Sequence, residues 1–234
     1  MVAVIGDIHG CFYTLTELYN KIKSKYPDIP VFSVGDLVDR GNNSFEVVEF
    51  VKEKEIQFTA GNHDLMFYYF FKRPTHPIGQ SWIYNGSETT LDSYSSQMDK
   101  VNGHLEYIIN APLFIDLDDC FISHAGISSY YQKQLKKGAL EDPEKLNKVL
   151  NKDLNSEHSV IWSRDVLMNL GKLQIVGHTR QQDVYHDEKS DALYIDTSPF
   201  TGNKLSAVLI EKSKLVDTID VTTSENDLNE QYAG

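Results

Sequence analysis

Short runs of β-branched and aliphatic residues alternate with amphipathic segments in the first quarter of the chain. Apolar runs at residues 2–5, 31–34 and 56–60 have the length and composition of buried strands. Between them, residues 12–26 and 44–54 repeat apolar positions every three to four residues, which is typical of helices. This order of strand, helix, strand, helix and strand predicts a parallel sheet of an α/β protein, with ligands bound beyond the carboxyl ends of the strands.

The remainder of the chain is richer in short apolar runs. The runs predicted to be strands are residues 113–117, 120–123, 160–162, 173–176, 192–195, 205–210 and 215–221. The first two would form a hairpin, and the last strands, which lie close together in the sequence, would form an antiparallel second sheet. Residues 128–158 are charged and are expected to be helical in part.

Two segments lack a clear hydrophobic period. Residues 72–104 are rich in Pro, Gly, Ser, Thr and aromatic residues, and we interpret them as an insertion or lid over a site. Residues 223–234 are polar and are expected to be a frayed tail. Because no internal repeat or linker interrupts the chain, residues 1–222 are predicted to form one domain.

Polar side chains follow the apolar runs at the points where the predicted strands end. Residues 6–10 read Gly-Asp-Ile-His-Gly, residues 35–41 read Gly-Asp-Leu-Val-Asp-Arg-Gly, and residues 61–64 read Gly-Asn-His-Asp. Carboxylate, imidazole and amide groups together suit a pair of divalent metal ions. The predicted metal ligands are Asp7, His9, Asp36, Asn62, His124 and His178. Two metals held close together favour hydrolysis at phosphorus.

The ligands divide between the two metals by their positions. Asp7 and His9 point to the same side of an extended segment, so they can hold one metal together. Asp36 can bridge both metals, because a carboxylate has two oxygens. Asn62, with the two later histidines, would complete the second metal.

Further polar residues are candidates for contact with the substrate. Arg40 and Arg164 carry planar guanidinium groups, which bind phosphate oxygens bidentately, and Asn62 and His63 would lie beside the same phosphate. His63 is expected to be the general acid, with Asp39 fixing its tautomer and raising its pKa. The nucleophile is expected to be a metal-bridging hydroxide, because a metal lowers the pKa of bound water.

Composition sets limits on the class of protein. The chain has 234 residues, of which 41% are hydrophobic and 24% charged, as is ordinary for a globular protein. Its net charge of −12 gives no basic surface for nucleic acid. No apolar run approaches the roughly 18 residues that cross a membrane, and the start lacks the pattern of a signal peptide. Two cysteines without a paired motif fit a reducing compartment, so we expect a cytoplasmic protein with neither nucleic-acid nor membrane partners.

At these motifs the chain resembles the calcineurin-like metallophosphoesterases, and most of all the compact bacterial and phage serine/threonine protein phosphatases of the phosphoprotein phosphatase superfamily. Residues 82–94, 160–164 and 194–197 resemble further segments of those phosphatases. The resemblance implies a four-layer α/β/β/α sandwich with two mixed sheets and a dinuclear metal site at strand ends. It also implies the six metal ligands given above, phosphate binding by Arg40 and Arg164, and the pairing of Asp39 with His63. Manganese is the expected metal, with iron or zinc as alternatives in one site.

The resemblance implies hydrolysis of phosphoserine and phosphothreonine in proteins by direct attack of water, with no phosphoenzyme. A second hypothesis is a symmetrical bis(5'-nucleosyl)-tetraphosphate hydrolase, because that sister group also has Asp where Asp64 stands. Against it, those hydrolases carry a non-acidic residue at the position of Asp39, and residues 72–104 offer few basic groups for a nucleotide. A third hypothesis, an inactive metal-binding scaffold, is disfavoured by the intact set of motifs. The sequence leaves the oligomeric state open.

The other histidines receive no functional role. They lie in polar stretches and are assigned to the surface: His76, His104, His158 and His186. The aromatic side chains of Trp82, Tyr84 and Tyr94 are interpreted as packing within the predicted lid.

Overall fold

The computed structural model describes residues 1–135 and 142–232. The α-helices are α1 (Phe12–Lys25), α2 (Ser44–Glu53), α3 (Asn62–Lys72), α4 (Pro77–Ser81), α5 (Ser87–Tyr94), α6 (Val101–Ile109) and α7 (Pro143–Lys152). The strands are β1 (Val2–Ile5), β2 (Val31–Ser33), β3 (Gln57–Phe58), β4 (Phe114–Asp116), β5 (Phe121–Ser123), β6 (Gln174–Val176), β7 (Tyr185–Asp187), β8 (Ala192–Tyr194), β9 (Lys204–Glu211) and β10 (Lys214–Thr222). Within the described part, none of these helices combines the length and apolar character needed to cross a membrane.

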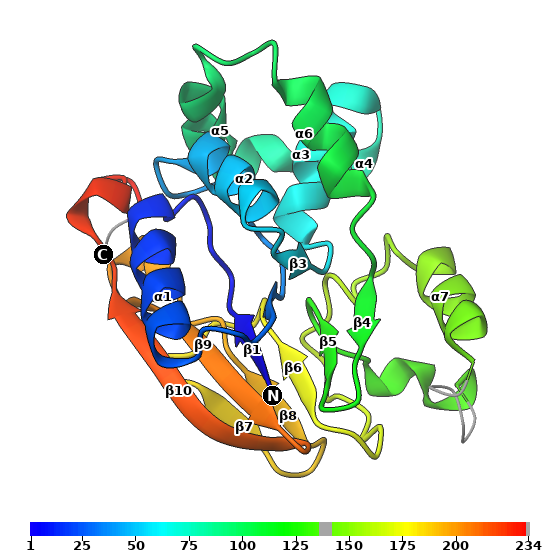
Figure 1. The fold of residues 1–234 in the computed structure, drawn as a ribbon. Coiled ribbons are helices and arrows are strands. Elements are labelled where there is room, and N and C mark those ends of the chain that lie inside the picture. Colours follow the sequence, from blue (N-terminus) through cyan, green and yellow to red (C-terminus); the bar gives the residue numbers. More distant parts are fainter. Residues whose placement is uncertain (136–141, 233–234) are drawn as a thin grey trace.

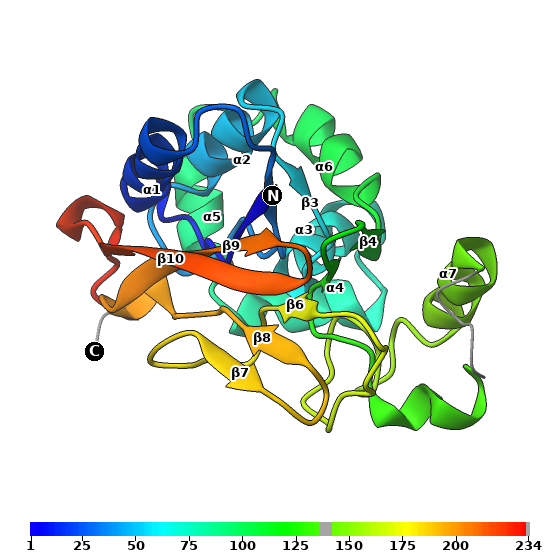
Figure 2. The same ribbon diagram turned by 60° about the horizontal axis from the view of Figure 1, so that its bottom comes forward.

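Two mixed five-stranded sheets form the centre of the molecule (Figures 1 and 2). The first has the order β10-β9-β1-β2-β3, in which β1, β2 and β3 are parallel and β9 and β10 are antiparallel. The second has the order β4-β5-β6-β8-β7, with a parallel centre and antiparallel edges. This arrangement confirms the predicted α/β fold class with two mixed sheets.

The alternation of side chains along β1 shows why the sheets stack. Val2 and Val4 point into an apolar layer shared with Ile122 and Ile175 of the second sheet. The intervening residues of β1 point the other way, into the layer beneath α1 and α2. Because successive residues of a strand face opposite sides, a strand apolar at every position is buried on both faces.

The outer face of the second sheet is covered by a thinner helical layer. Phe121 of β5 packs in a cluster with Leu146 and Leu150, which are the buried residues of α7. Figure 1 shows α7 beside β4 and β5, away from the helices of the first sheet. Helical structure was expected in part over residues 128–158, of which residues 136–141 lie outside the described part.

The prediction for the late strands was wrong in part. The strands β9 and β10 are antiparallel, as expected, but they extend the first sheet, where β9 pairs with β1. Residues 160–162 form a turn and not a strand, and β7 was missed. Strand propensity is local, whereas the sheet that a strand joins depends on contacts far along the chain.

Residues 72–104 are helical and packed, which corrects their interpretation as an irregular segment. They contain α4, α5 and the start of α6, and Trp82 and Tyr94 lie within the apolar core beside Phe67. Tyr84, by contrast, is 87% exposed, so its assignment to packing was wrong. Whether the segment moves as a lid stays a prediction.

The predicted frayed tail is anchored through its first part. Asp227 is fully buried, and its carboxylate accepts hydrogen bonds from the backbone N–H groups of Tyr13 and Thr14, at 3.0 and 2.8 Å. These groups belong to the first turn of α1, whose N-cap residue Cys11 makes no side-chain cap. The tail therefore supplies the missing cap from the far end of the chain, where a negative charge also suits the helix dipole.

Asp227→Ala is expected to lower the free energy of unfolding by about 2 kcal/mol, because it removes this cap and leaves buried N–H groups unpaired. Urea denaturation followed by circular dichroism measures the change. The matched control is Glu225→Ala, since Glu225 is an exposed acid in the same turn. Equal stability of the two variants would contradict the capping role.

Candidate active site

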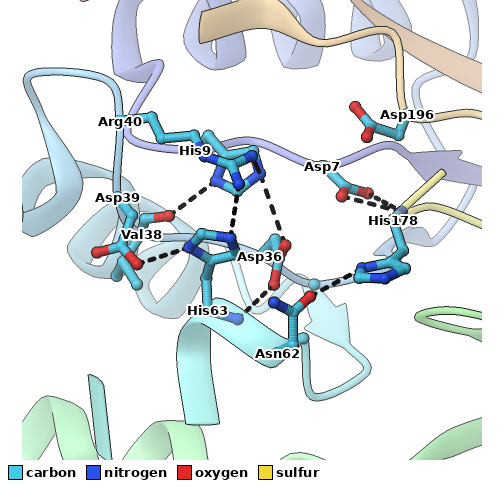
Figure 3. A network of polar contacts seen from close by, with 12 residues as sticks. Asp7, His9, Asp36, Val38, Asp39, Arg40, Asn62, His63, His178 and Asp196 are labelled. Atoms are coloured by element: carbon cyan, nitrogen blue, oxygen red, sulfur yellow. Dashed lines mark hydrogen bonds and ion pairs between the residues drawn. The ribbon is translucent and has the colours of Figure 1, made fainter. Parts of the chain in front are cut away.

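The predicted ligands meet where five strands end. Asp7 and His9 follow β1, Asp36 follows β2 and Asn62 begins α3 after β3. His124 directly follows β5, and His178 lies two residues after β6, so the second sheet completes the site. Figure 3 shows five of these side chains converging from separate loops, namely Asp7, His9, Asp36, Asn62 and His178. All six predicted ligands are buried.

Two clusters of donor atoms fit metal ions, and they share one residue. His9, Asp36 and His63 form one cluster, and Asp36, His124 and His178 form the other, with ligand atoms within 4.8 Å of one another in each. One oxygen of Asp36, Oδ2, lies 3.5 Å from Nε2 of both His9 and His124. Asp36 is therefore shared by the two clusters of donor atoms.

Asn62 and Asp7 lie beside the second cluster. The amide oxygen of Asn62 is 2.9 Å from His124 Nε2 and 2.9 Å from His178 Nδ1. Asp7 accepts a hydrogen bond from the backbone N–H of His178, with 3.0 Å to its Oδ2. Asp7 therefore lies near the second cluster, and it stands two residues before His9 of the first cluster in the sequence.

Backbone carbonyls orient the imidazole rings. Nδ1 of His9 lies 3.0 Å from the carbonyl oxygen of Val38, and Nδ1 of His124 lies 2.9 Å from that of Val34. A carbonyl can only accept, so each Nδ1 carries the proton and each Nε2 presents a lone pair. In His178 the carbonyl of Trp162 holds Nε2, at 3.1 Å, and Nδ1 faces the site. Such carbonyl partners are typical of metal-binding histidines.

Several site residues have left-handed backbone conformations that a non-glycine residue seldom adopts. Their φ angles are 47° for His9, 51° for Asp36, 77° for Asp39, 72° for Arg40 and 61° for His178. Each such conformation costs about 1–3 kcal/mol and persists only where surrounding contacts impose it. The clustering of this strain at the motifs marks them as a functional site.

Two glycines make room for the carboxylates. A Cβ atom at Gly61 would overlap Oδ1 of Asp36, and one at Gly177 would overlap Oδ1 of Asp7. At each position a carboxylate oxygen fills the space that a side chain would occupy. This gives a physical reason for glycine at both positions.

The electrostatics of the site suit positive ions. Burial raises the pKa of Asp7, as do the charges of Asp196 and Asp36. Burial also raises the pKa of Asp36 to about 7 and lowers that of His124 to about 4. Buried carboxylates crowded together with neutral imidazoles provide the charge and lone pairs that divalent metals need, so the residues fit a two-metal centre.

Metal affinity is expected to rise with pH through about 7, because the raised pKa values of Asp7 and Asp36 keep these carboxylates protonated at lower pH. Binding requires ionised carboxylates and neutral imidazoles, and His124 is already neutral above about pH 4. Protonation of Asp36, with its pKa of about 7, then competes with the metal. Manganese titrations of the metal-free protein from about pH 5 to pH 8 measure this dependence. A manganese affinity that does not change between about pH 5 and pH 7 would contradict this expectation.

Asp39 and His63 form a buried pair beside the first cluster. Nδ1 of His63 lies 2.7 Å from Oδ2 of Asp39. The carboxylate also accepts from Trp82 Nε1, at 2.8 and 2.9 Å, and from Thr90 Oγ1, at 2.7 Å. These donors fix Asp39, which in turn fixes the tautomer of His63 so that Nε2 faces the site.

The expected rise in the pKa of His63 is wrong for this structure. Burial lowers the pKa of His63 well below its ordinary value, and the positive charge of Arg40 adds to this. Burial raises the pKa of Asp39, against the effect of its hydroxyl and indole donors. Desolvation of both partners therefore outweighs their mutual attraction.

The two predicted arginines differ in their surroundings. Arg40 donates from Nη1 to His9 Nε2 and from Nη2 to His63 Nε2, both at 3.0 Å. Its guanidinium therefore lies among the ligands. Arg164 is exposed and lines a cavity of about 390 Å³ together with Tyr185 and Tyr194.

The sequence interpretation missed residues that support the site from behind. Asp64 is fully buried, and its carboxylate accepts from the backbone N–H groups of Leu37 and Gly61, which ties the Asp36 loop to α3. Trp82 and Thr90 hold Asp39 as described. The Trp-x-x-Asn-Gly stretch was the only signal for Trp82, and the sequence does not show which residue it contacts.

His104 was assigned to the surface, which is wrong. It is 2% exposed, and its Nδ1 lies 2.7 Å from the hydroxyl of Tyr94, while Nε2 bonds to Glu49. Of the other three, His186 is exposed, and His76 and His158 are half-buried.

Known proteins with similar sequences are phosphoesterases. The model of the calcineurin-like phosphoesterase family matches residues 1–201. A protein of Anoxybacillus flavithermus named bis(5'-nucleosyl)-tetraphosphatase PrpE (asymmetrical) is 32% identical over 148 residues, which is 55% of this chain and 58% of that protein. Its namesake in Halalkalibacterium halodurans is 32% identical over 144 residues, 53% of this chain and 56% of that protein. The match spans little more than half the length of these curated relatives.

Solved structures with the same fold come from several phosphatases. A putative diadenosine tetraphosphatase superposes with a TM-score of 0.62 at 19% identity, covering 96% of this chain and 94% of its own. A cold-active protein-tyrosine phosphatase of a Shewanella species superposes with a TM-score of 0.60 at 20% identity, covering 95% of this chain and 80% of its own. At these identities the likeness supports the fold alone.

The family model covers most of the chain, and every motif of the metal site lies within the matched residues. The fold and the donor set agree with this match. The chain therefore belongs to the calcineurin-like phosphoesterase family.

Proposed function

We propose that the protein is a phosphomonoesterase that removes phosphate from phosphoserine and phosphothreonine in proteins. The observation that carries this proposal is the Asp39–His63 pair, with its 2.7 Å contact held by Trp82 and Thr90. A serine or threonine alkoxide is strongly basic and needs a proton as it leaves. His63 would donate that proton.

The metal centre is proposed to hold two divalent ions, with manganese as the expected metal. Its ligands would be Asp7, His9, Asp36, Asn62, His124 and His178. When bound, such ions supply Lewis-acid polarisation of the phosphoryl group and activation of water. The protein contributes the oriented imidazoles and the shared Asp36 described above.

In the reaction, a water oxygen forms a bond to phosphorus while the bond from phosphorus to the serine or threonine oxygen breaks. His63 must first become charged, against the burial that lowers its pKa; Nε2 would then give its proton to the departing oxygen, while Asp39 stabilises the charged ring. Arg40 and Arg164 would bind the phosphoryl oxygens, with Asn62 beside them. Arg40 now donates to His63 Nε2, so its turning toward phosphate would also free that nitrogen for the leaving group.

A second candidate function is hydrolysis of dinucleoside tetraphosphates. The names of the curated relatives support it, since both are tetraphosphatases. Those names specify asymmetrical cleavage, whereas the hypothesis from the sequence was a symmetrical hydrolase. The cavity beside Arg164 also supports it, because Tyr185 is 52% exposed there and offers an aromatic face for a base. The weakly basic leaving group of an anhydride, however, gives little use to a general acid.

The test compares kcat/KM of the manganese-loaded protein for phosphoserine and phosphothreonine peptides with that for diadenosine tetraphosphate. A clear preference for the peptides supports the proposed function. A clear preference for the dinucleotide overturns it in favour of the second candidate. Product analysis then separates the two modes of cleavage, since asymmetrical cleavage yields AMP and ATP and symmetrical cleavage yields only ADP.

A further inference from the structure

Arg180 is a third arginine at the edge of the site, and the proposed reaction leaves it without a role. It lies two residues after the predicted ligand His178, and it is exposed. Its guanidinium carbon is 5.1 Å from the ring centroid of Phe200, and that of Arg40 is 4.5 Å from the same centroid. Because both distances end at one point, the two guanidinium groups lie within about 10 Å of each other.

The position of Arg180 is fixed by its surroundings. Its Nε–H donates to Ser198 Oγ at 2.9 Å. Ser198 has a left-handed backbone, with φ of 53°, and its N–H donates to the buried carboxylate of Asp196 at 2.9 Å. Phe200 is 4% exposed and packs edge-on against the ring of His9, with 5.0 Å between the centroids. A strained turn thus holds Arg180 next to the metal ligands.

Buried Asp196 interacts with the charge of Arg180 from a distance, without a salt bridge. Across residues 1–135 and 142–232, its guanidinium forms no salt bridge with a carboxylate. Arg40 stacks on the same ring and interacts with the same buried carboxylate, so the two cations share one acid and repel each other. In the proposed reaction, Arg40 and Arg164 bind the single phosphoryl group that is cleaved. The remaining cation has the chemistry to bind a further phosphate.

We propose that Arg180 binds a second phosphate group of the substrate, next to the phosphate that is cleaved. That group can be the next phosphate of a polyphosphate chain or a second phosphorylated side chain of a peptide. The inference rests on phosphoester hydrolysis at this site and deepens the proposed function by assigning a substrate preference. It does not depend on which of the two candidate substrates is the natural one.

The binding test uses calorimetry of the manganese-loaded protein, in excess manganese, with inorganic tripolyphosphate and with inorganic phosphate. Arg180→Ala is expected to weaken tripolyphosphate binding about tenfold and to leave phosphate binding unchanged, because it removes charge-assisted hydrogen bonds to the second group only. Arg180→Lys should recover part of the loss. The control is Arg73→Ala, since Arg73 is exposed on the C-cap of α3 and its removal changes net charge equally.

Kinetics with the same variants distinguish the sources of the second phosphate. If Arg180→Ala lowers kcat/KM only for doubly phosphorylated peptides, the second phosphate belongs to a phosphorylated side chain. If it lowers kcat/KM only for diadenosine tetraphosphate, the second phosphate belongs to a polyphosphate. Equal weakening of phosphate and tripolyphosphate, or no weakening of either, overturns the inference. If the wild-type protein hydrolyses no phosphopeptide, the proposed function fails, while the calorimetric comparison still decides the role of Arg180.

Discussion

Asp36→Ala is expected to remove both metal ions and to lower kcat by about 10³-fold or more, since the metals supply several kcal/mol of transition-state stabilisation. Asp36 belongs to both donor clusters, with one oxygen 3.5 Å from a histidine nitrogen of each. Loss of this one carboxylate therefore disturbs both metal positions. Metal content by mass spectrometry, together with turnover of p-nitrophenyl phosphate, measures the effect.

The comparison variant is Asp39→Asn, because Asp39 is a buried carboxylate of the same loop outside both clusters. It is expected to keep both metals while losing turnover. Unfolding of Asp36→Ala is not expected to explain its defect, since removing a buried carboxylate whose pKa is raised to about 7 relieves desolvation. Thermal denaturation of the metal-free proteins checks this point. Retention of two metals by Asp36→Ala would overturn the bridging role.

His63→Ala is expected to lower kcat for a phosphoserine peptide by about 10²–10⁴-fold, which is the range for loss of a general acid. Metal binding should survive, because the second cluster lacks His63 and the first keeps His9 and Asp36. The measurement pairs steady-state kinetics with metal analysis.

A substrate with a weakly basic leaving group provides the control for His63. Turnover of p-nitrophenyl phosphate should fall much less in His63→Ala, since its phenolate departs without a proton. An equal fall with both substrates would assign His63 to phosphate binding or to the metal site and not to proton transfer. Loss of metal from the variant would point to the metal site as well.

Much of the site was predictable from short stretches of sequence. The ligands of the first sheet lie directly after apolar runs, and the carboxyl ends of parallel strands share one edge, so Asp7, His9, Asp36 and Asn62 had to lie close together. The single histidines His124 and His178 were found in the same way. Helices such as α1 were predicted because their apolar period is a local property.

The tertiary structure alone decided how these pieces are held. Asp64, Trp82 and Thr90 act through contacts with residues elsewhere in the chain, and Asp227 caps a helix at the opposite end of the sequence. The pairing of β9 with β1 and the stacking of Arg180 on Phe200 are also contacts between residues that are not neighbours in the sequence. The sequence by itself determined the motifs, the local elements and the family, because residue type and spacing carry them. Which side chains support the motifs depends on packing between distant segments, and local spacing does not encode it.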